Sequence, residues 1–185
     1  MLSQPRLSVQ EFLRLPRSED QVHELRNGVL VQSKRPNKRQ DSRIFRAKRV
    51  LEPFARPLGI LMPHFPFCPL PDFEFRFIDL AFLSQKRWDS IPPDEYLTGS
   101  PDLAILLASP NESQAERAEK RGLCLAAGCI EFWIVHTEQQ QVETASASAT
   151  QTYSRGSTLP LISFAGQSLS VAALFAPQQQ PDKKA

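Results

Sequence analysis

The sequence predicts a single α/β domain, and three observations lead to this fold class. Short apolar runs bounded by turn residues, typical of buried strands, alternate with segments whose apolar residues recur at helical spacing. The chain has 185 residues, of which 41% are hydrophobic, enough for one core of ordinary size. No internal repeat is present, so one domain over residues 8–176 holds every predicted element, with flexible tails expected at 1–7 and 177–185.

A short helix and a hairpin are predicted first. Residues 8–11 (Ser-Val-Gln-Glu) have the spacing of a capping box, so a helix should begin there and stop before Pro16. Residues 27–28 (Asn-Gly) separate two apolar-rich runs and are typical of a two-residue hairpin turn. We therefore expect paired strands at about 21–26 and 29–33.

A longer helix is predicted to begin in a strongly basic stretch, residues 34–49, which we call the basic block. Eight cations and one acid give the block a net charge of +7. Because the whole chain has a net charge of +2, the rest of it carries −5. The cations are Lys34, Arg35, Lys38, Arg39, Arg43, Arg46, Lys48 and Arg49. Apolar residues recur between and after them at helical spacing, at Ile44, Ala47, Leu51 and Phe54. Pro53 and Pro57 should end or kink this helix.

Three strands are predicted in the middle of the chain. Residues 75–83 and 102–108 are almost wholly apolar, as in strands that are covered on both faces. Residues 60–68 should form a strand whose prolines suit a sheet edge. Residues 84–101 are predicted to be a loop with one helical turn near Trp88.

The last third should hold one helix and several short strands. Asn111 is placed to cap the helix and Gly128 to end it. Strands are then expected at 131–136, 141–146, 150–154 and 159–164, with a final helical turn near 170–175.

Asp79 is a lone carboxylate in the apolar run 75–83. Burying an unpaired carboxylate costs on the order of several kcal/mol, so Asp79 needs a partner. A metal ion, a cationic side chain or backbone N–H groups could each serve. Glu24 and Lys120 are weaker signals when taken alone. Their simplest interpretations are a solvent-facing strand residue and an exposed helix lysine paired with Glu116.

The order of these pieces along the chain is more informative. This order is typical of a metal-dependent nuclease: an early carboxylate, a second carboxylate in a buried strand, another buried strand, and then a helix that carries a lysine. Carboxylates can hold Mg²⁺, which prefers oxygen ligands and keeps several waters. The ion polarises the scissile phosphate and lowers the pKa of its bound water, and a lysine can stabilise the developing charge.

The sequence resembles the Uma-type putative restriction endonuclease family, a domain of unknown function in the PD-(D/E)XK nuclease superfamily. The matching segments, in order over roughly residues 7–175, are LSVQEFLRLP, HELRNGVLV, FRFIDLAFL, GSPDLAILLASPNE, EKRGLCLAAGCIEFWIV and LPLISFAGQSLSVAALF. The phrase SPDLAILLASPNE followed by K-x₇-G-x₄-W is the most specific of these matches. The resemblance implies a restriction-endonuclease-like core, a mixed central β-sheet flanked by helices.

The resemblance also implies site residues. The family's catalytic acids fall on Glu24 and Asp79, its active-site lysine falls on Lys120, and Asp79 would ligate Mg²⁺. The family's second metal-binding acid falls on Leu106, and the proline before the strand aspartate is replaced by Ile78. Leucine has no oxygen to offer Mg²⁺, so metal affinity and catalysis should fall steeply. The acids that could replace it are Asp102, Glu112, Glu116 and Glu119.

We therefore expect an impaired Mg²⁺-dependent DNA endonuclease. The alternative is a catalytically inactive nuclease-fold protein that binds nucleic acid or a protein partner. In either case the basic block should bind DNA phosphates through Lys38, Arg39, Arg43, Arg46, Lys48 and Arg49. The alternative interpretation of the block is a solvated helix face. The superfamily's frequent dimerisation makes a homodimer an expectation as well.

Two further features bear on where the protein acts. No apolar run is long enough to cross a membrane, and the first ten residues do not look like a secretion leader, so we expect a cytoplasmic protein. Cys68, Cys124 and Cys129 lack the spacing of a zinc site and are expected to be buried thiols.

Overall fold

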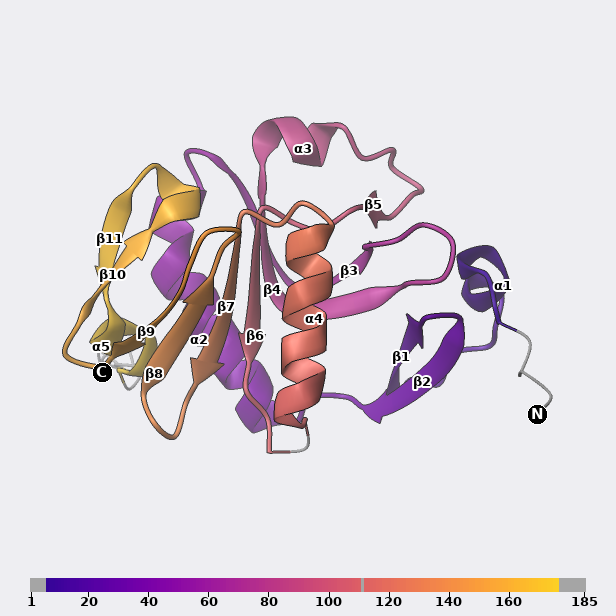
Figure 1. Cartoon of the computed structure of the whole chain (residues 1–185), viewed down its shortest axis with the longest axis horizontal. Helices are drawn as coiled ribbons and strands as arrows, with labels where there is room; N and C mark the ends of the chain where they lie inside the picture. The colour runs from indigo at the N-terminus through magenta and orange to yellow at the C-terminus, as the bar shows by residue number, and fades with distance from the viewer. Residues whose placement is uncertain (1–5, 111, 177–185) are drawn as a thin grey trace, which may run out of the picture.

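The computed structural model describes residues 6–110 and 112–176, and its centre is a seven-stranded mixed sheet in the order β5-β3-β4-β6-β7-β8-β9 (Figure 1). Its strands are β3 (Gly59–Cys68), β4 (Arg76–Ser84), β5 (Leu97–Thr98), β6 (Leu103–Leu107), β7 (Glu131–His136), β8 (Gln141–Ala145) and β9 (Thr150–Ser154). Two separate hairpins are formed by β1 (Gln21–Arg26) with β2 (Val29–Lys34) and by β10 (Thr158–Leu161) with β11 (Gln167–Ser170). The helices are α1 (Val9–Leu13), α2 (Lys38–Ala55), α3 (Gln85–Asp89), α4 (Gln114–Ala126), α5 (Val171–Phe175) and the 3₁₀ turn η1 (Ile162–Phe164).

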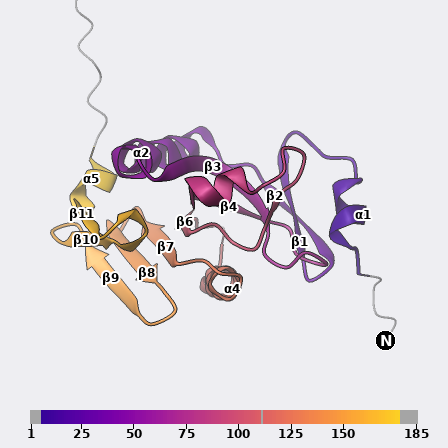
Figure 2. The same cartoon turned by 90° about the horizontal axis from the view of Figure 1, so that it is seen from above.

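Helices cover both faces of the central sheet, and Figure 2 shows α2 and α4 on opposite sides of it. On the α2 side, Leu51 packs in one apolar cluster with Leu80, Ile105 and Trp133. On the α4 side, a second cluster includes Ala81, Leu106, Cys124, Phe132 and Ile134. Residues that alternate along β4, β6 and β7 thus enter different clusters, as the two-residue period of a strand requires. Such double coverage explains why these strands are apolar almost throughout.

Most of the predicted elements are confirmed. The capping box of Ser8 and Glu11 begins α1, and α2 ends at Ala55, two residues before Pro57. β3 pairs with β5 over only two residues, so most of its outer side is a sheet edge, as its prolines suggested. All three cysteines are buried and free.

Three details differ from expectation. The segment 84–101 forms the predicted helical turn near Trp88 as α3, but it also contains the short strand β5, which was not expected. β11 was missed because its polar sequence QSLS has little apolar pattern. The expected cap Asn111 lies outside the described residues. The N-cap of α4 is Ser113, which forms a capping box with Glu116.

The β1–β2 hairpin docks on the end of β4 through a third apolar cluster. Leu25 forms an isolated bridge with Phe75, and both side chains are fully buried with Phe12 of α1. The hairpin turn needs Gly28, because its φ is +78° and a Cβ there would lie 2.6 Å from the Cβ of Arg6. Leu7 also donates its N–H to the Gly28 carbonyl. These contacts place the inner strand β1, and with it Glu24, next to β4.

Candidate functional site

Glu24 on β1 is buried, with 4% of its surface exposed, and is surrounded by donors. Its Oε2 accepts hydrogen bonds from Nε and Nη2 of Arg26 at 3.0 and 2.8 Å. Its Oε1 accepts from the Phe77 N–H at 2.9 Å and lies 3.3 Å from Nζ of Lys120. The interpretation of Glu24 as a solvent-facing strand residue is therefore wrong.

The pKa of Glu24 is lowered despite its burial. Burial by itself raises the pKa, but the charge of Lys120, the Phe77 N–H and the charge and hydrogen bonds of Arg26 together outweigh it. Glu24 is thus held as a carboxylate in the folded protein. Its contribution to stability is present at neutral pH and is lost as the pH falls through its folded-state pKa.

Lys120 on α4 is also buried, with 7% exposure. Besides Glu24, its Nζ donates to the Phe77 carbonyl at 3.3 Å and lies 3.9 Å from Oε1 of Glu112. The expected pair with Glu116 does not form. Glu116 instead caps its own helix through Ser113 and bridges to Arg26 of the hairpin.

Asp79 lies on β4 where that strand faces the end of β6. The two strands pair Leu80 with Ile105, so the next step of the antiparallel register puts Asp79 beside Leu106. Its Oδ2 accepts a hydrogen bond of 2.7 Å from the Leu107 N–H. Among the described residues, the partner of the Asp79 carboxylate is therefore a backbone N–H, and Asp79 forms no direct ion pair.

The pKa of Asp79 is raised, in contrast to that of Glu24. Burial is the main cause, and the carboxylate of Glu24 adds to it. The Leu107 N–H and the charges of Lys120 and His64 offset only part of this. The charges of Glu24 and Lys120 thus both act on Asp79.

Leu106 is 4% exposed and is fully used in packing. It pairs with Ile134 of β7 and joins the α4-side cluster with Cys124. Over residues 6–110 and 112–176, no group of three His, Cys, Asp or Glu side chains is placed to hold a metal ion. The residues present therefore do not fit a closed Mg²⁺ site. They fit at most an ion that keeps most of its waters and binds one or two carboxylates.

Glu112, in the segment before α4, is the best placed of the four acids that could replace Leu106. Burial raises its pKa, the charge of Lys120 lowers it, and the carboxylates of Asp79 and Glu24 raise it further. The other three acids are engaged elsewhere. Asp102 binds the Ser84 N–H and Arg87, each at 2.7 Å, while Glu116 and Glu119 pair with Arg26 and Arg76.

Arg76 is an important residue of this region that the sequence analysis missed. It is 1% exposed, and its Nε lies 2.7 Å from Glu74 while its Nη2 lies 2.5 Å from Glu119 of α4. Its Nη1 is 3.9 Å from Glu24. The signal in the sequence was the pair Glu74 and Arg76, two opposite charges at alternate positions just before and inside an apolar strand.

His64 on β3 was missed too. Its φ is +50°, a left-handed conformation that is unusual for histidine, and its Nε2 lies 3.3 Å from Oδ1 of Asp41 on α2. The pairs Pro63–Leu80 and Phe65–Ile78 flank it, so His64 stands opposite Asp79 in the sheet. No sequence pattern predicts this backbone conformation.

The basic block lies along α2, which begins near the site. Gln40 donates to Oγ of Ser109 at 3.3 Å, which brings the start of α2 to the segment after β6. Lys38, Arg39 and Arg49 are exposed, whereas Arg43, Arg46 and Lys48 are half-buried. Lys38 and Arg39, in the first helical turn, thus lie at the end of α2 that approaches the segment after β6.

Comparison with known proteins identifies the family. The model of the Uma2 family, described as "Putative restriction endonuclease", matches residues 9–172. The chain belongs to the Uma2 family. Its structure is similar to that of a protein described as a putative nuclease belonging to DUF820 from Anabaena variabilis ATCC 29413.

That likeness has a TM-score of 0.74 at 20% identity and covers 91% of this chain and 97% of the other. At this identity the likeness shows a shared fold, so the predicted mixed sheet flanked by helices is confirmed. No curated protein matches this Uma2 chain. No helix among its described residues is both long and apolar enough to cross a membrane.

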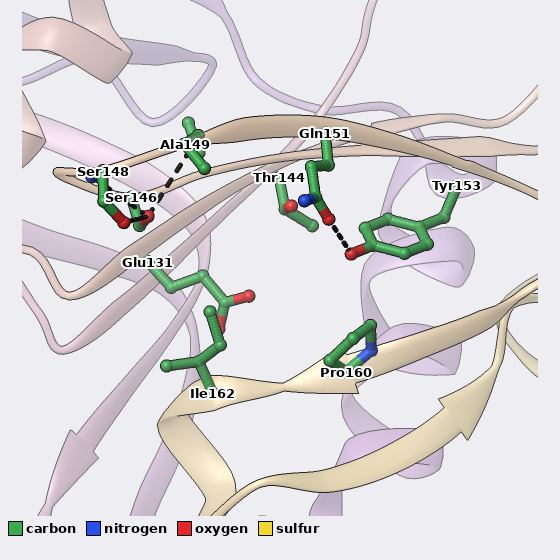
Figure 3. A pocket seen from close by; sticks show the side chains of 10 residues that line it. Glu131, Thr144, Ser146, Ser148, Ala149, Gln151, Tyr153, Pro160 and Ile162 are labelled. Atoms are coloured by element: carbon green, nitrogen blue, oxygen red, sulfur yellow. Dashed lines mark hydrogen bonds between the residues drawn. The ribbon is translucent and has the colours of Figure 1, made fainter.

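A separate hollow of about 190 Å³ lies between the β8–β9 hairpin and the β10–η1 segment of the Uma2 domain (Figure 3). Its buried acid is Glu131 at the start of β7, which is 1% exposed. Oε2 of Glu131 accepts hydrogen bonds from the backbone N–H and Oγ of Ser163 at 3.4 and 3.3 Å. These contacts tie the central sheet to η1, so we assign Glu131 a structural role.

One prediction follows from the raised pKa of Asp79. A carboxyl whose pKa is raised by folding stabilises the protein fully only below its unfolded-state pKa, and this contribution is lost as the pH rises through the folded-state value. Asp79→Asn keeps an acceptor for the Leu107 N–H and does not titrate. We therefore expect the variant to be more stable than wild type at pH 7 and to lose this advantage at pH 3, where the wild-type carboxyl is protonated in both the folded and the unfolded state. Urea unfolding at pH 3 and pH 7 would measure this, and an advantage equal at both pH values would contradict it.

Proposed function

We propose that the chain is an impaired Mg²⁺-dependent DNA endonuclease, which binds DNA and hydrolyses phosphodiester bonds slowly. The observation that carries this proposal is the convergence of three charged groups beside an aliphatic one. Glu24 and Lys120 are in contact at 3.3 Å, and the charges of both act on Asp79. Leu106, to which the family resemblance assigns the second metal ligand, lies beside Asp79 in the strand register. Family membership gives the reaction type.

The residues present support a weakly held ion. Asp79 would hold it, and the carboxylate of Glu112 is the second oxygen donor that could take part. When bound, Mg²⁺ would polarise the scissile phosphate and lower the pKa of its water. The absence of a carboxylate at position 106 removes both a ligand and a negative charge. The fraction of molecules that hold Mg²⁺ should therefore be low at ordinary Mg²⁺ concentrations.

Lys120 is positioned for the charge that develops on the phosphate. Glu24 and the Phe77 carbonyl fix its ammonium, so little reorganisation is needed when a phosphate arrives. Glu24 itself accepts four hydrogen bonds, two from Arg26 and one each from Phe77 and Lys120. Its role is therefore to orient Lys120.

Cleavage of supercoiled plasmid with Mg²⁺ or Mn²⁺ tests the activity. We expect slow nicking by the wild type, reduced by roughly 100-fold or more in Asp79→Ala and Lys120→Ala. Lys86→Ala is the matched control, because Lys86 is an exposed lysine of α3. Circular dichroism must show that the Lys120 variant is folded.

The same assay distinguishes the alternative function. If the purified wild type nicks nothing with either ion, the endonuclease proposal fails. The catalytically inactive, nucleic-acid-binding protein is then the function that the basic block supports.

DNA binding makes a separate prediction. Replacing Arg43, Arg46 and Lys48 together by alanine should weaken binding and lower the slope of log K against log salt concentration by up to about 0.9 per lost phosphate contact. Fluorescence anisotropy over a salt series measures both effects. The control removes the same charge outside the block, through Arg14, Lys86 and Arg155, which are all exposed. Equal losses of DNA affinity in the two triple variants would mean that the basic block has no special role in DNA binding.

A further inference from the structure

Phe45 stands out on the surface of α2. It lies in the middle of the basic block and is 48% exposed, although the side chains that anchor α2 to the sheet are almost completely buried. Those anchors are Ile44, Ala47, Leu51 and Ala55. Phe45 shares a different helix face with Asp41 and Lys48, four residues before it and three after it. The packing of α2 therefore does not require a large apolar side chain at this position.

A hollow of about 300 Å³ lies next to the Phe45 ring. It is lined by Phe45, Lys48, Arg49 and Glu52. Lys48 is bound to Glu52 at 3.1 Å, whereas Arg49 is exposed and has no ion pair among the described residues. An aromatic face next to a free guanidinium can bind a flat base and the phosphate that follows it.

This hollow is connected to the proposed site through His64. The rings of Phe45 and His64 meet edge to face with their centroids 6.3 Å apart. His64 in turn contacts Asp41 and stands opposite Asp79 in the sheet. Its left-handed backbone is of a kind that tends to occur at functional sites. The surface around Phe45 and Arg49 is thus linked to Asp79 by neighbouring residues, through the Phe45–His64 ring contact and the pairing of β3 with β4.

We propose that this surface binds a single nucleic-acid strand, with an unpaired base stacked on Phe45 and the neighbouring phosphates on Lys48 and Arg49. This inference rests on the proposed function and adds to it a substrate class, single-stranded DNA or DNA with locally unpaired bases. The bases of an intact duplex are stacked on one another and offer no free face to a helix-borne ring. Stacking on an aromatic side chain is worth about 1–3 kcal/mol per base.

The test measures binding of an oligothymidine and of a duplex by fluorescence anisotropy, without divalent metal, so that cleavage plays no part. Phe45→Ala should raise the Kd for the single strand by roughly 5- to 150-fold and leave that for the duplex nearly unchanged. Phe45→Trp should retain single-strand binding, and its additional indole emission should be quenched by the oligothymidine. Ile162→Ala, at a 55% exposed residue outside α2, is the matched control and should change neither Kd.

The outcomes separate the two proposals. Three results would each overturn the stacking proposal and leave the proposed function in place: unchanged single-strand binding in Phe45→Ala, an equal loss on duplex DNA, or an added indole emission in Phe45→Trp that the oligothymidine does not quench. A wild type that binds neither form of DNA would overturn both proposals.

Discussion

Leu106→Glu is expected to destabilise the metal-free protein by about 2–5 kcal/mol and to make its stability depend on Mg²⁺. The leucine is 4% exposed and packs with Cys124 and Ile134, so the substitution removes packing and places a carboxylate in an apolar cluster. The new carboxylate would also lie beside the carboxylate of Asp79, and two neighbouring negative charges repel each other. Mg²⁺ held by the two carboxylates would offset the charge repulsion and the cost of the buried charge, but not the lost packing.

Thermal unfolding in EDTA and in increasing Mg²⁺ measures this effect. An ion at 100 times its Kd stabilises the folded state by about 2.7 kcal/mol, and titration calorimetry should detect its binding directly. Leu106→Gln is the control, because it disturbs the packing equally and adds no charge. A Leu106→Glu protein that gains no more from Mg²⁺ than the glutamine variant would show that position 106 is not the lost ligand position.

Arg76→Leu is also expected to have a large effect and should lower the free energy of unfolding by about 3–5 kcal/mol. Arg76 is 1% exposed and lies 2.7 Å from Glu74, which is itself 6% exposed. Removing the guanidinium leaves Glu74 as a buried charge without this partner and also releases Glu119 of α4. Most of the loss is the cost of leaving an acid unpaired in the interior, and not the intrinsic strength of the pair.

The control for Arg76 follows from that distinction. In the double variant Arg76→Leu, Glu74→Leu the buried acid is absent as well, so part of the stability should return in urea unfolding. A double variant less stable than Arg76→Leu alone would contradict this account. It would mean that Glu74 matters mainly through the Asn27 N–H, to which its Oε1 is bound at 2.7 Å.

Local signals in the sequence were sufficient for most of the fold. The capping box at Ser8, the Asn27-Gly28 turn and the apolar strands around Asp79 and Leu106 each act within a few residues, so they can be read without the tertiary structure. The adjacency of those two strands and the site residues came from the resemblance to a family. β11 was missed because it is held by its hairpin partner and not by an apolar pattern of its own.

The electrostatic partners could not be predicted in this way. Lys120 has Glu116 four residues before it, the usual helical partner, yet it is bound to Glu24, 96 residues away. The involvement of Glu112 and Arg76 likewise depends on how α4 packs beside β4 and the hairpin. The left-handed φ of His64 depends on the pairing of β3 with β4, so no local residue preference reveals it.

The contacts of Glu24 also determine how the N-terminal hairpin is fastened to the rest of the chain. β1 and β2 form their own two-stranded sheet, and among the described residues the Leu25–Phe75 pair is the only β-bridge that joins β1 to a segment outside the hairpin. The remaining ties between β1 and its surroundings include Glu24 to Lys120 and Phe77, and Arg26 to Glu116. A Uma2 protein without any hydrolytic activity would still use Glu24 and Lys120, together with the apolar cluster around Leu25 and Phe75, to hold this hairpin in place. Selection for folding alone could therefore preserve the residues by which such enzymes are usually recognised.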